Sequence, residues 1–214
     1  MSEETRSGIY PLQNSNTALI VVDVQNDFCH SKGVFSKYRE ANLDQVQQAV
    51  KNISTLIRKC RECEIPIIFI QTIHSPWTNS PSWGKRLEGS GEKMRICPPN
   101  EFGSQFFTVE PQENDCIVTK HRYSAFVGTD LNLILRSKGI ENILVTGVAT
   151  NVCVETTARD GYNRDYNVVF VEDCCGAYDE EEHAATLNNI RKFFGTVVTS
   201  GSLIENFVHS SASS

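Results

Sequence analysis

Short runs of consecutive apolar residues recur along this sequence, and longer amphipathic stretches separate them. The first run extends from Thr17 to Asp23 and has no polar residue between its ends. Such a run is typical of a parallel strand that helices cover on both faces. Comparable runs occur at residues 65–72, 116–120, 143–145, 167–173 and 196–199. The alternation predicts an α/β fold with a doubly wound, mostly parallel sheet and right-handed crossovers.

Capping patterns indicate where several of the intervening helices begin and end. Asn42 with Gln45, and Asp179 with Glu182, have the spacing of a capping box. In this motif a polar side chain accepts a hydrogen bond from a backbone N–H three residues further on. Gly139 follows an apolar stripe and is expected to end a helix, because glycine readily adopts the backbone conformation found after a helix.

The length of 214 residues fits one domain with a substantial buried core. Residues 1–16 are polar and predict an N-terminal arm, and residues 17–207 form the expected domain. The serine-rich residues 208–214 predict a disordered tail. Residues 74–114 have little periodicity, and so long a stretch inside a domain usually serves as a functional lid or a subunit contact.

Charge and composition favour a small-molecule partner. The formal net charge is −6, both signs are interspersed, and there is no basic block, so nucleic acid and an anionic membrane surface are disfavoured as partners. No G-x-x-x-x-G-K-[ST] sequence occurs, and no G-x-G-x-x-G follows the first run, which argues against a nucleotide. We therefore expect no cofactor.

The cysteines are expected to be free thiols. The first residues contain no apolar signal region, and no apolar run is long enough to span a bilayer, so we expect a cytoplasmic, reducing setting. Cys60 and Cys63 match C-x-x-C, but no second pair follows at the spacing of a zinc ribbon. We expect these two cysteines, like Cys174 and Cys175, to be packed thiols, with metal or redox use as the alternative for the first pair.

One cysteine differs from the others because it follows a buried run directly. Cys153 lies just after the run that begins at Ile143, where Thr150 or Asn151 is a plausible helix N-cap. In the first turn of a helix, free backbone N–H groups and the helix dipole favour a thiolate and lower the thiol pKa. Cys153 is therefore a candidate nucleophile, and a small packed apolar residue is the alternative.

Two charged residues close other buried runs and complete a reactive set with this cysteine. Asp23 ends the first run and Lys120 the third, so a parallel sheet delivers both to the edge that receives Cys153. The lysine ammonium favours a thiolate, and the carboxylate is able to take the thiol proton and return it to a leaving amine. The backbone N–H groups of Ala149 and Cys153 are candidates for an oxyanion hole. This combination predicts amide hydrolysis.

Three segments resemble the motifs of the isochorismatase-like cysteine hydrolases: Val22 to Phe28, Lys120 to Phe126, and Gly147 to Val154. The resemblance extends from about residue 17 to residue 207. It implies a three-layer α/β/α sandwich, a catalytic triad of Asp23, Lys120 and Cys153, and a cis peptide bond between Val148 and Ala149. It also implies a homodimer or homotetramer.

Differences within this family narrow the expected reaction. Isochorismatases that cleave a vinyl ether lack the nucleophilic cysteine, whereas Cys153 is present here. Nicotinamidases carry a metal-binding Asp-x-His pair after the second strand, whereas this sequence reads Thr72-Ile-His74. We therefore expect no metal. The closest resemblance, over residues 120–126 and 149–161, is to ureidoacrylate amidohydrolases and the related biuret and N-carbamoyl hydrolases.

The sequence thus predicts a cysteine amidohydrolase that cleaves a C–N bond of a small ureido or carbamoyl compound through a thioester and releases ammonia or an amine. Tyr123 is predicted to contact substrate, and Phe28, Thr72 and His74 are weaker candidates for the pocket wall. Arg122 either faces substrate or forms a structural ion pair. The alternatives are another cysteine amidase such as a nicotinamidase, and a non-catalytic, partner-binding or redox-sensing subunit with this fold.

Overall fold

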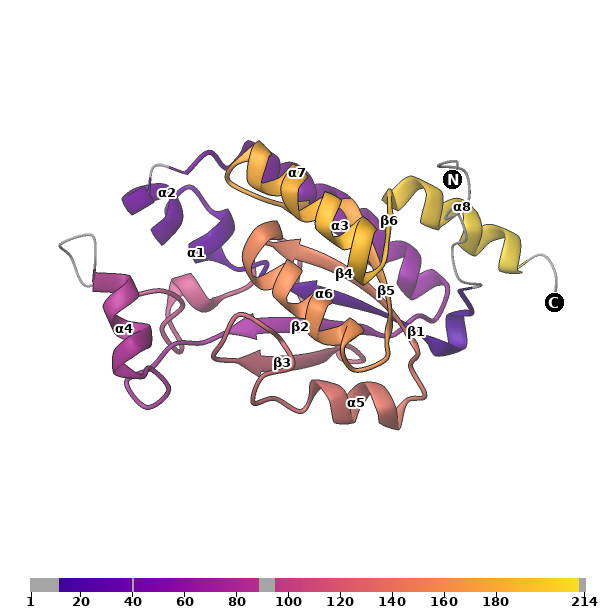
Figure 1. The fold of residues 1–214 in the computed structure, drawn as a ribbon, viewed down its shortest axis with the longest axis horizontal. Helices are drawn as coiled ribbons and strands as arrows, with labels where there is room; N and C mark the ends of the chain where they lie inside the picture. Colours follow the sequence, from indigo (N-terminus) through magenta and orange to yellow (C-terminus); the bar gives the residue numbers. More distant parts are fainter. Residues whose placement is uncertain (1–11, 40, 89–94, 212–214) are drawn as a thin grey trace.

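A single parallel sheet organises the computed structural model, which describes residues 12–39, 41–88 and 95–211. Within these residues the sheet has six strands in the order β3-β2-β1-β4-β5-β6, and every neighbouring pair is parallel (Figure 1). The strands are β1 (Thr17–Val22), β2 (Ile67–Thr72), β3 (Cys116–Lys120), β4 (Asn142–Val148), β5 (Asn167–Gly176) and β6 (Thr196–Val198). The predicted α/β class is confirmed, and the sheet is parallel throughout.

Helices cover both faces of the sheet and give three layers. One face carries α3 (Asp44–Glu62) and α8 (Ser200–Ser211), and the other carries α5 (Leu131–Ser137), α6 (Glu155–Tyr162) and α7 (Glu180–Asn189) with its continuation η4 (Ile190–Phe194). The short elements are η1 (Asn14–Asn16), α1 (Asn26–Cys29), α2 (Val34–Arg39), α4 (Pro81–Glu88), η2 (Phe102–Ser104) and η3 (Thr150–Val154). Among the described helices, none has the length and apolarity needed to cross a membrane.

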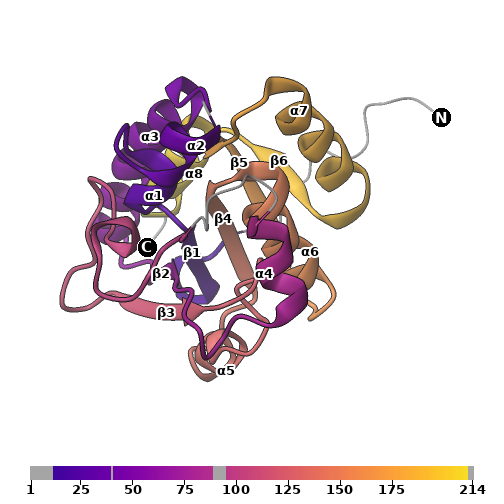
Figure 2. The same cartoon turned by 90° about the vertical axis from the view of Figure 1, so that its left-hand side faces the viewer.

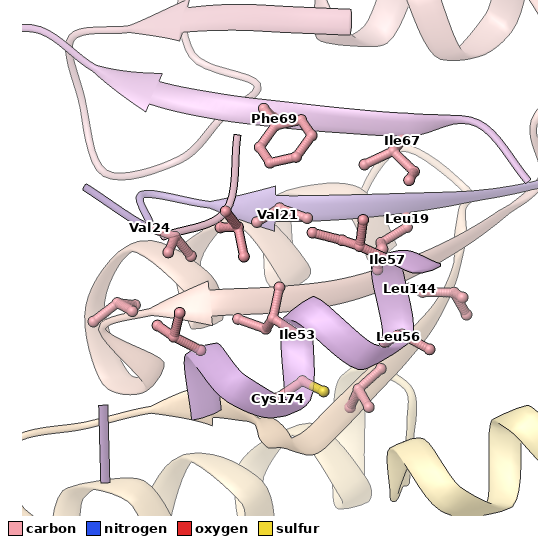
Figure 3. Packing of buried hydrophobic residues seen from close by; sticks show 14 of the residues in the cluster. Leu19, Val21, Val24, Ile53, Leu56, Ile57, Ile67, Phe69, Leu144 and Cys174 are labelled. Carbon is pink, nitrogen blue, oxygen red and sulfur yellow. The ribbon is translucent and has the colours of Figure 1, made fainter. Parts of the chain in front are cut away.

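The continuous apolar runs are explained by burial on both faces of the strands. In β1 every residue is buried, with Leu19 and Val21 packing toward α3 while Ile20 packs into the opposite cluster. Figure 3 shows the α3 side, where Ile53 and Leu56 lie against the sheet. Because alternate side chains of a strand point to opposite faces, a strand between two helical layers needs apolar residues at every position.

The predicted N-cap is correct for α7 and is wrong by one residue for α3. Asp179 caps α7 as predicted, and its carboxylate accepts a hydrogen bond of 3.0 Å from the backbone N–H of Glu182. The other pattern is shifted, because Asn42 accepts a bond of 2.9 Å from the N–H of Asp44 while Leu43 is the N-cap of α3. Asn42 thus shapes the turn before the helix instead of capping it.

The predicted arm, tail and irregular segment can be compared with the structure where their residues are described. Residues 1–11 and 212–214 lie outside the described residues, while residues 14–16 of the expected arm form η1. The predicted tail at 208–214 begins too early, because α8 continues to Ser211. The helix is held on the sheet by the buried side chains of Leu203 and Phe207, and a packed apolar face overrides the weak helix propensity of serine. Residues 74–114, apart from the undescribed 89–94, contain α4 and η2.

Gly147 marks the place where β4 approaches β1 most closely. Its φ is 124°, and a Cβ atom at this position would lie 2.0 Å from the carbonyl oxygen of Val22. We expect Gly147→Ala to lower the free energy of unfolding by about 3 kcal/mol or more, because both the backbone conformation and the contact forbid a side chain. Urea denaturation measures the change.

Gly84 provides the matched control for this substitution. It lies within α4, and a Cβ atom there would meet no other atom within 4 Å. We expect Gly84→Ala to leave stability unchanged or to raise it by up to about 1 kcal/mol, because alanine favours a helix over glycine. A Gly147→Ala protein as stable as the Gly84→Ala protein would contradict the close approach of the two strands.

Candidate active site

Asp23, Lys120 and Cys153 meet at the carboxyl edge of the sheet. Asp23 follows β1, Lys120 ends β3, and Cys153 lies in η3 directly after β4. The strands β3, β2, β1 and β4 are consecutive neighbours, so their ends form one contiguous edge, which faces the viewer in Figure 2. Asp23 itself has a φ of 53°, in the left-handed region that turns the chain away from the strand.

A fully buried ion pair forms the centre of this cluster. The Nζ atom of Lys120 lies 2.7 Å from Oδ2 of Asp23, and both side chains are at most 1% exposed. Thr72 at the end of β2 bridges them: its hydroxyl donates to Oδ1 of Asp23 at 2.8 Å and accepts from Lys120 at 2.7 Å. A charge buried to this degree requires a partner of opposite charge and further hydrogen bonds.

The Lys120 ammonium contacts several acceptors besides Asp23. It donates hydrogen bonds to the Thr72 hydroxyl, to the Arg122 carbonyl at 3.0 Å and to the Cys153 sulfur at 3.5 Å. Its contact with Oδ2 of Asp23 joins opposite charges at 2.7 Å. The Asp23 carboxylate also interacts with the Cys153 thiol, so the cation and the carboxylate both face the sulfur.

The surroundings of Cys153 raise its thiol pKa and favour the neutral form, contrary to the sequence-based expectation of a lowered pKa. Burial raises the pKa of Cys153 strongly; Lys120 lowers it, and the Asp23 carboxylate raises it again. Burial by itself lowers the pKa of Lys120, but the charges of Asp23 and Cys153 more than offset this effect, so Lys120 stays protonated. The prediction was wrong because it considered the cation and the helix terminus but not desolvation.

The turn that carries Cys153 also departs from the predicted capping. Residues Thr150–Val154 form a π-helical turn with Ala149 as its N-cap, and neither Thr150 nor Asn151 caps it. The peptide bond between Val148 and Ala149 is cis, as the family resemblance implies. In the part of the chain that the structure describes, the backbone N–H of Ala149 has no hydrogen-bond partner.

The predicted substrate-contacting residues fall into two groups. Phe28 belongs to the apolar core, where its ring centroid lies 5.3 Å from that of Phe35, and Thr72 belongs to the ion-pair cluster. His74 and Tyr123 both lie beside Trp83, with ring centroids at 5.6 and 4.8 Å from the indole.

Among the described residues, Arg122 forms no ion pair and instead donates hydrogen bonds to the backbone. Its Nη1 atom donates to the carbonyl oxygens of Thr78 and His121, at 3.0 and 2.6 Å. Its guanidinium carbon lies 5.0 Å from the centroid of the Trp83 ring. The residue thus connects the segment after β3 to the segment before α4.

Sequence reasoning missed the role of Gln25, which is buried in the middle of the first motif. Its side-chain nitrogen donates to the carbonyls of Thr72 and Ser104, and its oxygen accepts from the backbone N–H of Thr72 at 2.8 Å. Gln25 therefore fixes the end of β2, where Thr72 contacts both members of the ion pair. The only signal for this role is its place two residues after Asp23.

The described residues at this edge form no metal-binding cluster, and the cavity described below lies elsewhere. No group of three or more His, Cys, Asp or Glu residues that could hold a metal occurs among residues 12–39, 41–88 and 95–211. A cavity of about 470 Å³ lies on the α3 side and is lined by residues that include Ser54, Arg58 and Val109. It contains none of the clustered residues.

Comparison with known proteins identifies the group to which this arrangement belongs. The sequence model of the isochorismatase domain matches residues 17–202, which is most of the chain. The chain belongs to the isochorismatase family.

Relatives in the isochorismatase family match this chain over nearly its whole length. Ureidoacrylate amidohydrolase RutB of Acinetobacter baylyi is 32% identical over 92% of this chain and 86% of that protein. A cysteine hydrolase from Pseudomonas syringae pv. phaseolicola has a TM-score of 0.81 at 28% identity, covering 94% of this chain and 96% of that chain. N-carbamoylsarcosine amidase from Thermoplasma acidophilum has a TM-score of 0.70 at 28% identity, covering 86% and 96%. The predicted family and fold are confirmed.

In this isochorismatase-family chain, α7 is attached to the turn that carries the cysteine. The hydroxyl of Thr150 lies 3.0 Å from Nδ1 of His183, and the amide of Asn151 donates to Glu182 at 2.7 Å. Thr150 is fully buried, and burial lowers the pKa of His183, which favours the neutral imidazole. The two bonds attach η3 to α7.

The Asp23 carboxylate should restrain the reactivity of the resting Cys153 thiol. Because its carboxylate raises the pKa of Cys153, we expect Asp23→Asn to lower that pKa and to speed alkylation of Cys153 by iodoacetamide at pH 7. Mass spectrometry of the Cys153 peptide between pH 6 and 10 gives the rate. Slower alkylation of Asp23→Asn than of the wild type would contradict a neutral, carboxylate-facing thiol.

The bond between Thr150 and His183 should contribute to stability. Thr150→Val keeps the side-chain shape but removes the partner of a half-buried imidazole nitrogen, so we expect a loss of about 1 kcal/mol in the free energy of unfolding. Thr55→Val, at an exposed position of α3, is the control and should change stability by less than about 0.5 kcal/mol. Equal effects of the two substitutions would show that this contact does not stabilise the fold.

Proposed function

We propose that this chain is a cysteine amidohydrolase that cleaves a C–N bond of a small ureido or carbamoyl compound and releases ammonia or an amine. The observation that carries the proposal is the contact of the Cys153 sulfur with Lys120, at 3.5 Å, next to the buried carboxylate of Asp23. A nucleophile, a base and a cation within one desolvated cluster suit acyl transfer to a thiol.

In the first step, the Cys153 sulfur attacks the carbonyl carbon while its proton passes to Oδ2 of Asp23. The coupling fits the raised pKa of the thiol and the interaction of the Asp23 carboxylate with it. The carbonyl oxygen becomes an oxyanion, which the backbone N–H groups of Ala149 and Cys153 are positioned in the chain to bind. One such donor contributes roughly 3 kcal/mol in other enzymes.

In the second half of the reaction, the tetrahedral intermediate collapses and the C–N bond breaks. Asp23 returns its proton to the leaving nitrogen, which departs as ammonia or an amine, and the acyl group remains on the sulfur as a thioester. A water molecule then attacks the thioester with Asp23 as its base, giving the acid and regenerating the thiol. Throughout, Lys120 stabilises the negative charge that moves between the carboxylate and the sulfur.

The named relatives support the substrate class. Ureidoacrylate amidohydrolase and N-carbamoylsarcosine amidase both act, by their names, on a terminal carbamoyl group attached to nitrogen. Their reaction needs a planar carbonyl group with nitrogen as the leaving group. In the cluster around Cys153, Asp23 is the group that we propose takes and returns the proton. A ureido or carbamoyl compound is therefore the substrate that we propose.

Ammonia release from a panel of small amides tests the proposal. We expect the wild type to release ammonia from at least one of ureidoacrylate, biuret and N-carbamoyl amino acids, and Cys153→Ala to lose about 10⁴-fold or more of that rate. Nicotinamide belongs in the panel because a nicotinamidase is the alternative amidase.

Cys116→Ala is the matched control for the nucleophile. Cys116 begins β3, at the end of that strand opposite to Lys120, and its removal should leave the rate within about twofold of the wild type. Ammonia release from nicotinamide alone would contradict a ureido substrate and favour a nicotinamidase. No release from any compound would favour a non-catalytic subunit with this fold.

A further inference from the structure

A cluster of aromatic side chains stands next to the proposed catalytic residues. Helix α4 lies beyond the carboxyl ends of the strands and crosses in front of them in Figure 2. It brings Trp83 to His74, which follows Thr72 by two residues, and to Tyr123, which follows Lys120 by three. The three rings therefore come from elements that begin where β2 and β3 end.

Unpaired polar atoms concentrate in this same region. Among the described residues, six buried side-chain nitrogen or oxygen atoms have no hydrogen-bond partner. Three of them are Nδ1 of His74, Oδ1 of Asn79 and Nε1 of Trp83. Native proteins leave few buried polar atoms unpaired, and each costs about 1–3 kcal/mol unless a ligand or water pairs with it. Their concentration at one edge indicates a group that binds there.

The chemistry of the three atoms near α4 restricts that group. The indole of Trp83 donates a hydrogen bond and accepts none, while the side-chain oxygen of Asn79 only accepts. Burial, followed by the charge of Lys120, lowers the pKa of His74 to about 4, so its imidazole is neutral at pH 7. The region thus offers neutral donors and acceptors together with flat rings, which complement a planar amide or urea.

Arg122 is a cation of this region that the fold already uses. Its guanidinium contacts the Trp83 ring, and its Nη1 atom donates to two backbone carbonyls. A carboxylate at the subsite would leave the Asn79 oxygen without a donor, because both groups only accept hydrogen bonds. An uncharged amide supplies a donor as well as an acceptor.

We propose that His74, Asn79 and Trp83 form a subsite for the non-reacting end of the substrate, and that this end is an uncharged planar amide or urea group. The proposal rests on the proposed function and specifies its substrate class. Biuret and related carbamoyl amides fit this subsite, whereas a substrate that ends in a carboxylate fits it less well.

Binding of two matched ligands tests the subsite without turnover. The ligands are 3-ureidoacrylamide and 3-ureidoacrylate, which differ only in an amide or a carboxylate at the end distant from the ureido group. Isothermal titration calorimetry with the Cys153→Ala protein measures both affinities. We expect the amide to bind at least about tenfold more tightly, because the site then pairs each of its neutral donors and acceptors.

Two tryptophan substitutions in the Cys153→Ala background supply the control. Trp83→Phe removes the indole N–H and keeps an aromatic ring, so amide binding should weaken about five- to tenfold. Trp77→Phe changes the other tryptophan of the same segment, which is 97% exposed, and should leave binding unchanged.

The outcomes separate this inference from the proposed function. Equal or tighter binding of the carboxylate, absence of binding by both ligands, or equal effects of the two tryptophan substitutions would overturn the subsite. Release of ammonia from 3-ureidoacrylate by the wild type, lost in Cys153→Ala, would still support the amidohydrolase. Wild-type protein that binds the amide but cleaves no ureido compound would instead contradict the proposed function alone.

Discussion

The ion pair between Asp23 and Lys120 is the interaction on which the rest of this edge depends. Both charges are removed from water, and breaking such a pair by removing one partner typically costs about 3–5 kcal/mol. The pair persists because Thr72 donates to one member and accepts from the other, and because the Arg122 carbonyl takes a further ammonium hydrogen. The ends of β1, β2 and β3 are thereby held in register by charge as well as by backbone bonds. The sulfur of Cys153 enters a site whose electrostatics are already set.

The fold followed from the sequence because its strongest signals are local. An uninterrupted apolar run such as the one that ends at Asp23 has one stable environment, a strand between two helical layers. Capping was predicted less well, since Asn42 and Asp179 carry the same pattern and only Asp179 caps a helix. The helix start near Asn42 depends on how the preceding loop approaches the sheet, which no four-residue pattern records.

The candidate site was predictable to the extent that strand ends and family motifs specify it. Asp23, Lys120 and Cys153 each close a buried run, so a parallel sheet was bound to bring them together. The state of the thiol was not predictable in this way, because desolvation depends on side chains from several distant segments. Trp83 and His183 were missed for the same reason: each contacts the site from a helix whose position only the folded chain defines.

The strand order has a consequence for how this protein acquires its chemistry. Asp23, Thr72, Lys120 and Cys153 lie at the ends of four strands that are neighbours in space but are separated by long crossovers in the chain. No hairpin, helix pair or other local unit contains two members of the ion-pair cluster. Parallel pairing between distant segments forms slowly compared with helices. Cys153 therefore has the surroundings of an ordinary cysteine until the centre of the sheet is complete, and only the folded chain places its sulfur between a buried carboxylate and a buried ammonium.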